Sequence, residues 1–337
     1  MASKRQALVL LLCLITFSSS ITSSLGSQGG IAIYWGQNNG DLSLTETCDT
    51  KKYEIVLLAF LAQFGCDREV KWNFAGHCGD WSPCTKLQSE IQYCQSKGIK
   101  VLLSLGGADV RPTYDYSLCS PQDAKNVAKY LYNNFLNGQN GPLGSVTLDG
   151  IDFDIEYSDL YWDDLAKELD TYRQSGRYFY LSAAPQCPTE PYIYYLGKAI
   201  ETGLFDYIFI QFYNNPQCAC SRSDGVGKLL NSWAKWASIV QPNNTIFLGL
   251  PAAESAAGSG YCPPDMVNDG VLPIIKNTPN YGGIMLWDRF RDVQADFSGK
   301  VLPNVIKSNV ILQSMTAVSD AIFECVSAAL NRIKPKA

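Results

Sequence analysis

The chain has 337 residues, of which 46% are hydrophobic and 18% charged, and this composition supports a large folded core. Its formal net charge is -5 at pH 7, and no run rich in Lys and Arg occurs along it. We therefore expect neither nucleic acid nor a membrane as a partner.

Residues 1–27 have the pattern of a secretory signal peptide. Two basic residues precede an apolar run from Ala7 to Phe17, and small polar residues follow it. The run is too short to span a bilayer, so we expect a secreted, extracellular protein whose signal is removed between Ser20 and Gln28. A buried N-terminal helix is the alternative.

Eight short apolar runs recur between residues 28 and 305, and they are continuous rather than alternating, as in strands buried in a parallel sheet. They are Ile31–Trp35, Ile55–Phe60, Lys100–Leu105, Gly150–Ile155, Tyr178–Ala184, Tyr207–Tyr213, Ile246–Leu250 and Gly283–Trp287. Segments with helical character, such as residues 121–136, 160–176 and 228–240, lie between them. The repeated alternation predicts a single α/β domain, a (β/α)8 TIM barrel over residues 28–305. The alternative is an open doubly wound sheet, but no G-x-G-x-x-G motif follows the first run.

Residues 306–337 lie beyond the eighth predicted strand and differ from the rest of the chain. They have a helical pattern and end in basic residues. We interpret them as a C-terminal helical extension. If the extension is a sorting propeptide, the alternative location is the vacuole.

Cysteine usage agrees with an oxidising compartment. The chain has twelve cysteines, and Cys13 lies in the predicted signal, so an odd number remains and at least one is free or pairs between chains. A zinc site at His77, Cys78 and Cys84 is an alternative to disulfides, but disulfides are favoured in a secreted chain.

The stretch LDGIDFDIEYSD, residues 148–159, contains a row of alternating acids that we call the acid row: Asp152, Asp154 and Glu156. On a strand these side chains share one face, roughly 6.6 Å apart, while the intervening apolar residues take the other face. In a barrel the acids point inward, and Glu156 lies at the carboxyl end, where active sites of this fold are found. Burial and mutual repulsion raise the pKa of at least one of them, as a general acid requires.

Two other interpretations of the acid row remain open: a solvated acidic face, or a site for Mg²⁺ or Ca²⁺. The chain has a single histidine, His77, and no G-x-S-x-G motif, which disfavours Ser-His-Asp and Cys-His catalysis. Carboxylates combined with many Tyr and Trp residues suggest a carbohydrate substrate.

The segment DGIDFDIE matches the D-G-x-D-x-D-x-E signature of glycoside hydrolase family 18. The chain also resembles the plant class III chitinases of the hevamine type over nearly all of residues 29–290. The segments that carry this resemblance are GGIAIYWGQN, FAGHC, KVLLSLGG, DAKNVA, LYWDDLA, LSAAPQCP, TGLFDY, QFYNNP, IFLGLPAA and YGGIMLWDRF.

The resemblance implies a (β/α)8 endochitinase that hydrolyses β-1,4 linkages in chitin and chito-oligosaccharides with retention of configuration. It implies catalysis assisted by the substrate's own N-acetyl group. We expect no cofactor or metal, and a monomer. The resemblance also implies lysozyme activity on peptidoglycan.

The resemblance assigns four catalytic positions. Glu156 would protonate the glycosidic oxygen, and Asp154 would orient the N-acetyl group whose carbonyl oxygen attacks C1. Tyr213 would stabilise the cyclic intermediate, and Asp152 would share the proton of Asp154. The substrate-binding positions that it implies are Trp287, Gln211, Tyr34, Gln37, Phe60 and Asn73.

The resemblance also implies three disulfides, Cys48–Cys94, Cys78–Cys84 and Cys187–Cys218. Five further cysteines have no assigned partner: Cys66, Cys119, Cys220, Cys262 and Cys325.

Two departures from the family pattern adjoin the acid row. Tyr157 stands where the family often has His, which could alter the pH range of the acid. The segment GGADVRPTYDYS replaces a more glycine-rich loop, so contacts from Asp109 and Arg111 would be new.

Because an altered loop could close the groove, a non-catalytic relative (a lectin, a glycosidase inhibitor or a storage protein) is a second hypothesis. Cation binding by an acid-rich chain is a third.

Overall fold

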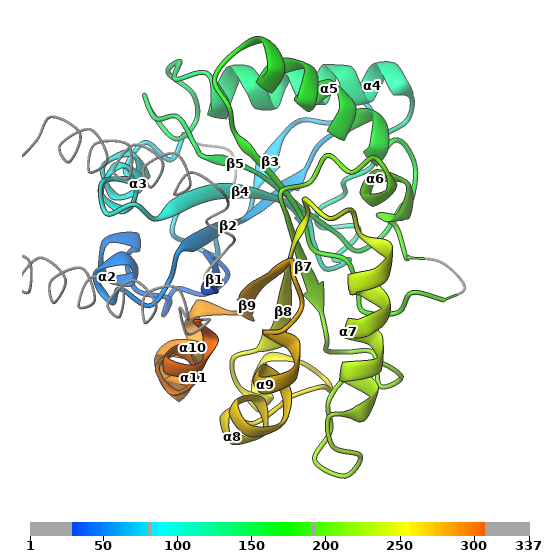
Figure 1. Ribbon diagram of the computed structural model, residues 1–337. Helices are drawn as coiled ribbons and strands as arrows, with labels where there is room; N and C mark the ends of the chain where they lie inside the picture. The colour runs from blue at the N-terminus through cyan, green and yellow to red at the C-terminus, as the bar shows by residue number, and fades with distance from the viewer. Residues whose placement is uncertain (1–28, 80–82, 191–192, 307–337) are drawn as a thin grey trace, which may run out of the picture.

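The structure, a computed structural model, describes residues 29–79, 83–190 and 193–306 (Figure 1). The predicted signal peptide, Cys325 and all of the predicted extension except Ile306 lie outside these residues. Within the described part of the chain, no helix is both long and apolar enough to cross a bilayer.

Eight parallel strands form a closed barrel with helices around it (Figure 1). The strands are β1 (Gly30–Trp35), β2 (Ile55–Gln63), β4 (Lys100–Gly107), β5 (Gly150–Ile155), β6 (Tyr180–Ala183), β7 (Tyr207–Gln211), β8 (Thr245–Pro251) and β9 (Tyr281–Trp287). They neighbour one another in the order β1-β9-β8-β7-β6-β5-β4-β2, and the pairing of β1 with β2 closes the ring. The TIM-barrel prediction is confirmed, and the open-sheet alternative is wrong. A further short strand, β3 (Lys71–Trp72), pairs antiparallel with β2.

Helices follow most strands and cover the outside of the barrel (Figure 1). They are α2 (Leu44–Asp49), α3 (Leu87–Ser96), α4 (Pro121–Leu131), α5 (Trp162–Ser175), α6 (Gly197–Glu201), α7 (Gly227–Ile239), α8 (Pro264–Met266), α9 (Leu272–Ile275), α10 (Arg289–Ala295) and α11 (Phe297–Val305). The sequence explains the start of α4: Ser120 caps it by accepting a hydrogen bond from the backbone N–H of Asp123, and Pro121 occupies the first turn.

Each strand buries both of its faces, which explains the continuous apolar runs. On β5, Ile151, Phe153 and Ile155 face outward and belong to the large core between strands and helices. A second, smaller core fills the barrel interior and includes Ala32, Leu57, Phe209, Phe247 and Met285. The acid row occupies the interior face of the same strand, so its carboxyls stand where apolar side chains fill the rest of the barrel.

The described residues contain five disulfides, of which Cys48–Cys94 joins helices α2 and α3. Three are the pairs implied by the resemblance, Cys48–Cys94, Cys78–Cys84 and Cys187–Cys218. The other two join cysteines that the sequence left unassigned, Cys66–Cys119 and Cys220–Cys262. The zinc alternative is therefore wrong, because the sulfurs of Cys78 and Cys84 bond to each other.

Candidate active site

Asp152 forms the deepest position of the acid row, with no exposed surface. The strand register places Ser104 of β4 and Ser182 of β6 beside it on either side. Both serine hydroxyls donate to its carboxylate at 2.6 Å, and the Tyr34 hydroxyl donates at 2.9 Å. Burial raises the pKa of Asp152, while these donors oppose the rise by stabilising the charged form.

Asp154 is the middle position and is 3% exposed. Burial raises its pKa well above the ordinary value, and the neighbouring charges of Glu156 and Asp152 raise it further. The side-chain amide of Gln211 donates to Oδ1 of Asp154 at 2.8 Å and to the Ala184 carbonyl oxygen at 2.9 Å. Asp154 is therefore protonated at pH values where an ordinary aspartate is charged.

Glu156 directly follows β5 and is half-buried, so of the three carboxyls it reaches furthest toward the surface. Burial raises its pKa, and a hydrogen bond with Gln211 opposes the rise. Because Asp154 and Glu156 repel each other when both are charged, the pair retains a proton to higher pH than separate carboxyls would. A carboxyl group whose pKa is raised thus lies at the carboxyl end of the barrel.

Tyr213 lies two residues beyond β7 and is 7% exposed. Burial raises the pKa of its phenol well above the ordinary value, and the charges of Asp154 and Glu156 add to the effect. The hydroxyl therefore stays protonated and can donate a hydrogen bond beside the acid row.

Three aromatic rings form a cluster at the same end of the barrel. Trp287 ends β9 and is half-buried. Its ring packs against Phe60 with centroids 5.9 Å apart and against the edge of Tyr34 at 5.4 Å. Phe60 and Tyr34 are themselves buried, so they support Trp287 from below, and Trp287 presents the accessible surface.

Gln37 and Asn73 are the remaining predicted binding residues, and their side chains form hydrogen bonds with the backbone. The side-chain amide of Gln37 donates to the carbonyl oxygens of Ala59 and Asn73, both at 2.9 Å. The Asn73 side chain accepts from the backbone N–H of Ala75. Both residues are half-buried, so parts of their side chains still reach the surface.

The loop after β4 packs against the residue that follows Glu156. The Arg111 guanidinium lies 4.2 Å from the centroid of the Tyr157 ring and forms a two-pronged ion pair with Asp109. The Tyr157 hydroxyl donates to Asp115 at 3.1 Å. The two departures from the family pattern are thus in contact with each other.

Among the described residues, one group of side chains has the spacing of a metal site: Cys66, Cys119 and Asp123. The two sulfurs form a disulfide, and the Asp123 carboxylate accepts hydrogen bonds from the backbone N–H groups of both cysteines. The group therefore fastens a loop, and its donor set does not suit an ion.

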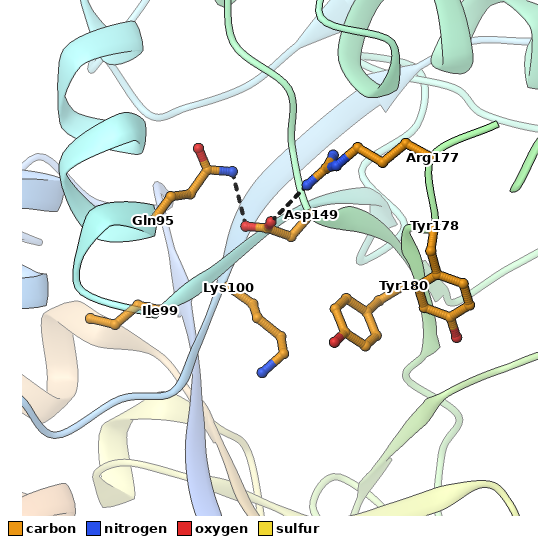
Figure 2. Close-up of a pocket in the computed structure, with 8 residues that line it drawn as sticks. Gln95, Ile99, Lys100, Asp149, Arg177, Tyr178 and Tyr180 are labelled. Atoms are coloured by element: carbon orange, nitrogen blue, oxygen red, sulfur yellow. Dashed lines mark hydrogen bonds and ion pairs between the residues drawn. The ribbon is translucent and has the colours of Figure 1, made fainter.

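A cavity of about 340 Å³ lies at the opposite end of the barrel (Figure 2). Its lining includes Lys100 and Tyr180, which begin β4 and β6, and Asp149, which precedes β5. The Asp149 carboxylate already accepts from Gln95 at 2.9 Å and pairs with Arg177 at 3.3 Å. This cavity faces the amino ends of the strands, away from the acid row.

Comparison with known proteins agrees with this geometry. The family "Glycosyl hydrolases family 18" matches residues 30–260. An acidic endochitinase of Vitis vinifera is 47% identical over 299 residues, which cover 87% of this chain and 97% of that protein. The crystal structure of the ICChI chitinase from Ipomoea carnea is 48% identical, with a TM-score of 0.76 over 82% of this chain and 100% of that one. A xylanase and α-amylase inhibitor protein from Scadoxus multiflorus is 42% identical, with a TM-score of 0.74 over 82% of this chain and 98% of that one.

The matched region contains the whole acid row together with Tyr213, and the relatives are covered over almost their full lengths. The resemblance drawn from the sequence is confirmed: the chain belongs to family 18 of the glycosyl hydrolases.

Proposed function

We propose that the protein is an endochitinase that cleaves β-1,4 linkages between N-acetylglucosamine units. The observation that carries the proposal is the graded burial of the acid row: Asp152 and Asp154 are buried, and Glu156 is half-buried beside them with a raised pKa. A carboxyl that keeps its proton and reaches the surface meets the requirement for protonating a leaving group. The acidic endochitinases among the relatives support the choice of chitin and chito-oligosaccharides as substrates.

In the proposed mechanism, Glu156 donates its proton to the glycosidic oxygen as the bond to C1 breaks. The carbonyl oxygen of the substrate's N-acetyl group attacks C1 from the other side and forms a cyclic oxazolinium ion. Asp154 holds the N–H of that group, and its negative charge stabilises the ion once the proton has moved toward Asp152. The neutral Tyr213 phenol donates to the N-acetyl group and keeps it oriented for attack.

Water then opens the oxazolinium ion, and Glu156, now ionised, takes the proton from that water. Two displacements at C1 give retention of configuration. Trp287 supplies the apolar platform under the reacting sugar, since its ring is the accessible member of the aromatic cluster. Gln211 donates a hydrogen bond to Asp154 and so keeps the acid row aligned during both steps.

We propose that residues 1–27 direct secretion, that residues 28–305 form the catalytic domain and act as a monomer, and that residues 306–337 are an extension that could direct the chain to the vacuole instead. The five disulfides within the described ranges support passage through an oxidising compartment. Peptidoglycan, which shares the β-1,4-linked N-acetylated sugars, is the proposed second substrate.

The second candidate is an inhibitor of other glycosidases, which the Scadoxus multiflorus protein favours by its structural similarity. The presence of both Glu156 and Tyr213 opposes this candidate, because binding a foreign enzyme requires neither a proton donor nor a neutral phenol beside it.

The deciding experiment measures the release of reducing ends from colloidal chitin by the wild-type chain and by Glu156→Gln. We expect turnover by the wild type and none by the variant, with binding of chito-oligosaccharides retained. Glu201→Gln, an exposed glutamate at the end of α6, is the matched control and should be fully active. Wild-type activity should also vanish on de-N-acetylated substrate. A wild type without turnover would favour the inhibitor, and an active Glu156→Gln would reject the mechanism.

A further inference from the structure

The backbone of Glu156 is held by a residue that the sequence did not single out. The hydroxyl of Tyr116 accepts a hydrogen bond from the Glu156 backbone N–H at 2.9 Å and donates one to the Gly107 carbonyl oxygen at 2.6 Å. The ladder between β4 and β5 ends at the pair Gly107 and Ile155. The phenol therefore joins the two strands one step beyond the last residue pair, at the residue that would act as the acid.

The local sequence makes room for this phenol. A Cβ atom on Gly106 would lie 2.9 Å from Cζ of Tyr116, and Gly106 has a φ of +97°. A residue with a side chain at this position would be strained and would push the phenol away. Gly106, the second-last residue of β4, thus permits the contact between Tyr116 and the two strands.

Tyr116 is itself held firmly. Its ring is 2% exposed, stacks on Phe64 with centroids 5.9 Å apart, and contacts the Tyr157 ring at 4.0 Å. Its backbone N–H donates to the Tyr157 hydroxyl at 2.6 Å, and Tyr157 in turn donates to Asp115. Tyr116 therefore fixes Glu156 through its hydroxyl and Tyr157 through its backbone.

The loop that carries Tyr116 is fastened to the neighbouring loop after β2. Cys119 is joined to Cys66 by a disulfide, and Asp115 forms an ion pair with Arg68 at 2.7 Å. The Asp123 carboxylate accepts hydrogen bonds from the backbone N–H groups of both cysteines. The disulfide, the ion pair and these hydrogen bonds restrict movement of the loop. The Tyr116 phenol therefore cannot move away from the strands unless several of them break.

We propose that Tyr116 is a positioning residue for the catalytic acid, because its hydroxyl fixes the backbone from which the Glu156 carboxyl projects. The inference rests on the proposed chitinase activity. The groups that act on that carboxyl are Asp154 of β5, Gln211 of β7 and Tyr213 just beyond β7. Tyr116 comes from the loop after β4, and its side chain accepts the hydrogen bond from the Glu156 backbone N–H.

The test compares two substrates that differ in how much they need the acid. A sugar leaving group must be protonated as it departs, whereas 4-nitrophenolate leaves readily without a proton. In Tyr116→Phe, kcat on chitotetraose should fall by about 10- to 100-fold, since misplacing a catalytic group by about 1 Å can cost about 100-fold. On 4-nitrophenyl N,N′-diacetylchitobioside, kcat should fall several-fold at most. KM should change little on either substrate.

Tyr281→Phe is the matched control, because Tyr281 is also fully buried and its hydroxyl also donates to a backbone carbonyl, that of Val305, at 2.9 Å. This variant should keep the wild-type ratio of the two activities. If Tyr116→Phe does not fold, Tyr157→Phe, which removes the acceptor of the Tyr116 N–H, should show the same selective loss to a smaller degree.

Equal losses on both substrates, or no loss on chitotetraose, would overturn the role of Tyr116 while leaving the chitinase assignment intact. A wild-type chain that cleaves neither substrate would instead refute the chitinase assignment, and the role of Tyr116 with it.

Discussion

The Tyr34 hydroxyl meets the Asp152 carboxylate inside the barrel at 2.9 Å, although the two residues are 118 positions apart in the chain. Ser104 and Ser182 donate to the same carboxylate. A fully buried carboxylate is costly unless hydrogen bonds stabilise its charge, and three hydroxyls supply them here. The charge retained on Asp152 is one reason that the pKa of Asp154 is raised.

Tyr34→Phe should therefore shift the pH dependence of the reaction. Losing one donor raises the pKa of Asp152, which lowers the negative charge behind Asp154. The pair formed by Asp154 and Glu156 should then release its shared proton at lower pH. The basic limb of kcat/KM, where the acid loses its proton, should move to lower pH. Stability should fall by roughly 1.5–3 kcal/mol, the range for a buried hydrogen bond to a charged group.

The measurement is a pH profile of kcat/KM on chito-oligosaccharides for the wild type and Tyr34→Phe. Ser104→Ala removes another donor from Asp152 and should move the limb in the same direction. If the basic limb of kcat/KM lies at the wild-type pH in both variants, the hydroxyls that donate to Asp152 do not affect the pKa of the acid row.

Asp154→Asn should abolish turnover and make the protein more stable at neutral pH. Because the folded-state pKa of Asp154 is raised, the folded chain holds a proton that the unfolded chain releases above roughly pH 4. The folded state then binds more protons than the unfolded state, so wild-type stability falls as pH rises through this window. Asparagine carries no proton to lose and can still accept the hydrogen bond from Gln211.

The free energy of unfolding, measured with denaturant between pH 4 and pH 7, should therefore diverge between Asp154→Asn and the wild type. The gap should widen toward higher pH by up to roughly 1.4 kcal/mol per pH unit until the folded-state pKa is passed. Asp159→Asn, at an exposed site just beyond the acid row, should show no such gap. If Asp154→Asn were less stable than the wild type at every pH, the buried Asp154 carboxyl would not destabilise the folded state at neutral pH.

The sequence predicted the barrel and the acid row for one physical reason. Residues 150–156 alternate between apolar and acidic side chains, and on a strand of a closed barrel this alternation sends one set to the helices and the other to the interior. Each of the eight apolar runs overlaps a strand of the barrel, because strands buried on both faces cannot contain long polar stretches.

The contacts that set the chemistry were harder to predict. Ser104 and Ser182 lie beside Asp152 only through the register of three strands, and register depends on loop geometry that a single sequence does not reveal. Tyr116 reaches Glu156 from a loop without a repeating pattern. The pairing of Cys66 with Cys119 was likewise open, since spacing alone does not determine disulfide connectivity.

Trp287→Ala should weaken substrate binding more than it slows the chemical step. The half-buried ring rests on Phe60 and Tyr34, so its removal takes away the accessible platform but leaves the acid row in place. Losing roughly 2 kcal/mol of apolar contact corresponds to about a 30-fold rise in Kd. Calorimetry with chito-oligosaccharides in a Glu156→Gln background isolates binding from turnover. Trp287→Phe should recover part of the affinity, and an unchanged Kd in Trp287→Ala would place the sugar elsewhere.

Gly260→Ala should displace Tyr213 and lower both activity and stability. Gly260 has a φ of +91°, and a Cβ atom there would lie 2.6 Å from the Tyr213 Cα and 2.9 Å from the Phe212 carbonyl oxygen. The neighbouring backbone must therefore shift, at a cost of roughly 2–4 kcal/mol, and the phenol that would orient the N-acetyl group moves with it. We expect kcat on chito-oligosaccharides to fall at least about tenfold at temperatures where the variant remains folded.

Gly225→Ala separates this effect from backbone strain alone. Gly225 also has a positive φ, +71°, but nothing lies within 4 Å of a Cβ atom placed there. This control should lose roughly 1 kcal/mol of stability and keep its kcat, because the alanine is strained but pushes against no neighbour. Thermal unfolding and kcat, measured for both variants, distinguish displacement of Tyr213 from the effect of backbone strain alone. If Gly260→Ala retained full activity while folded, the position of the Tyr213 phenol would not depend on the close packing of the residue 260 backbone against it.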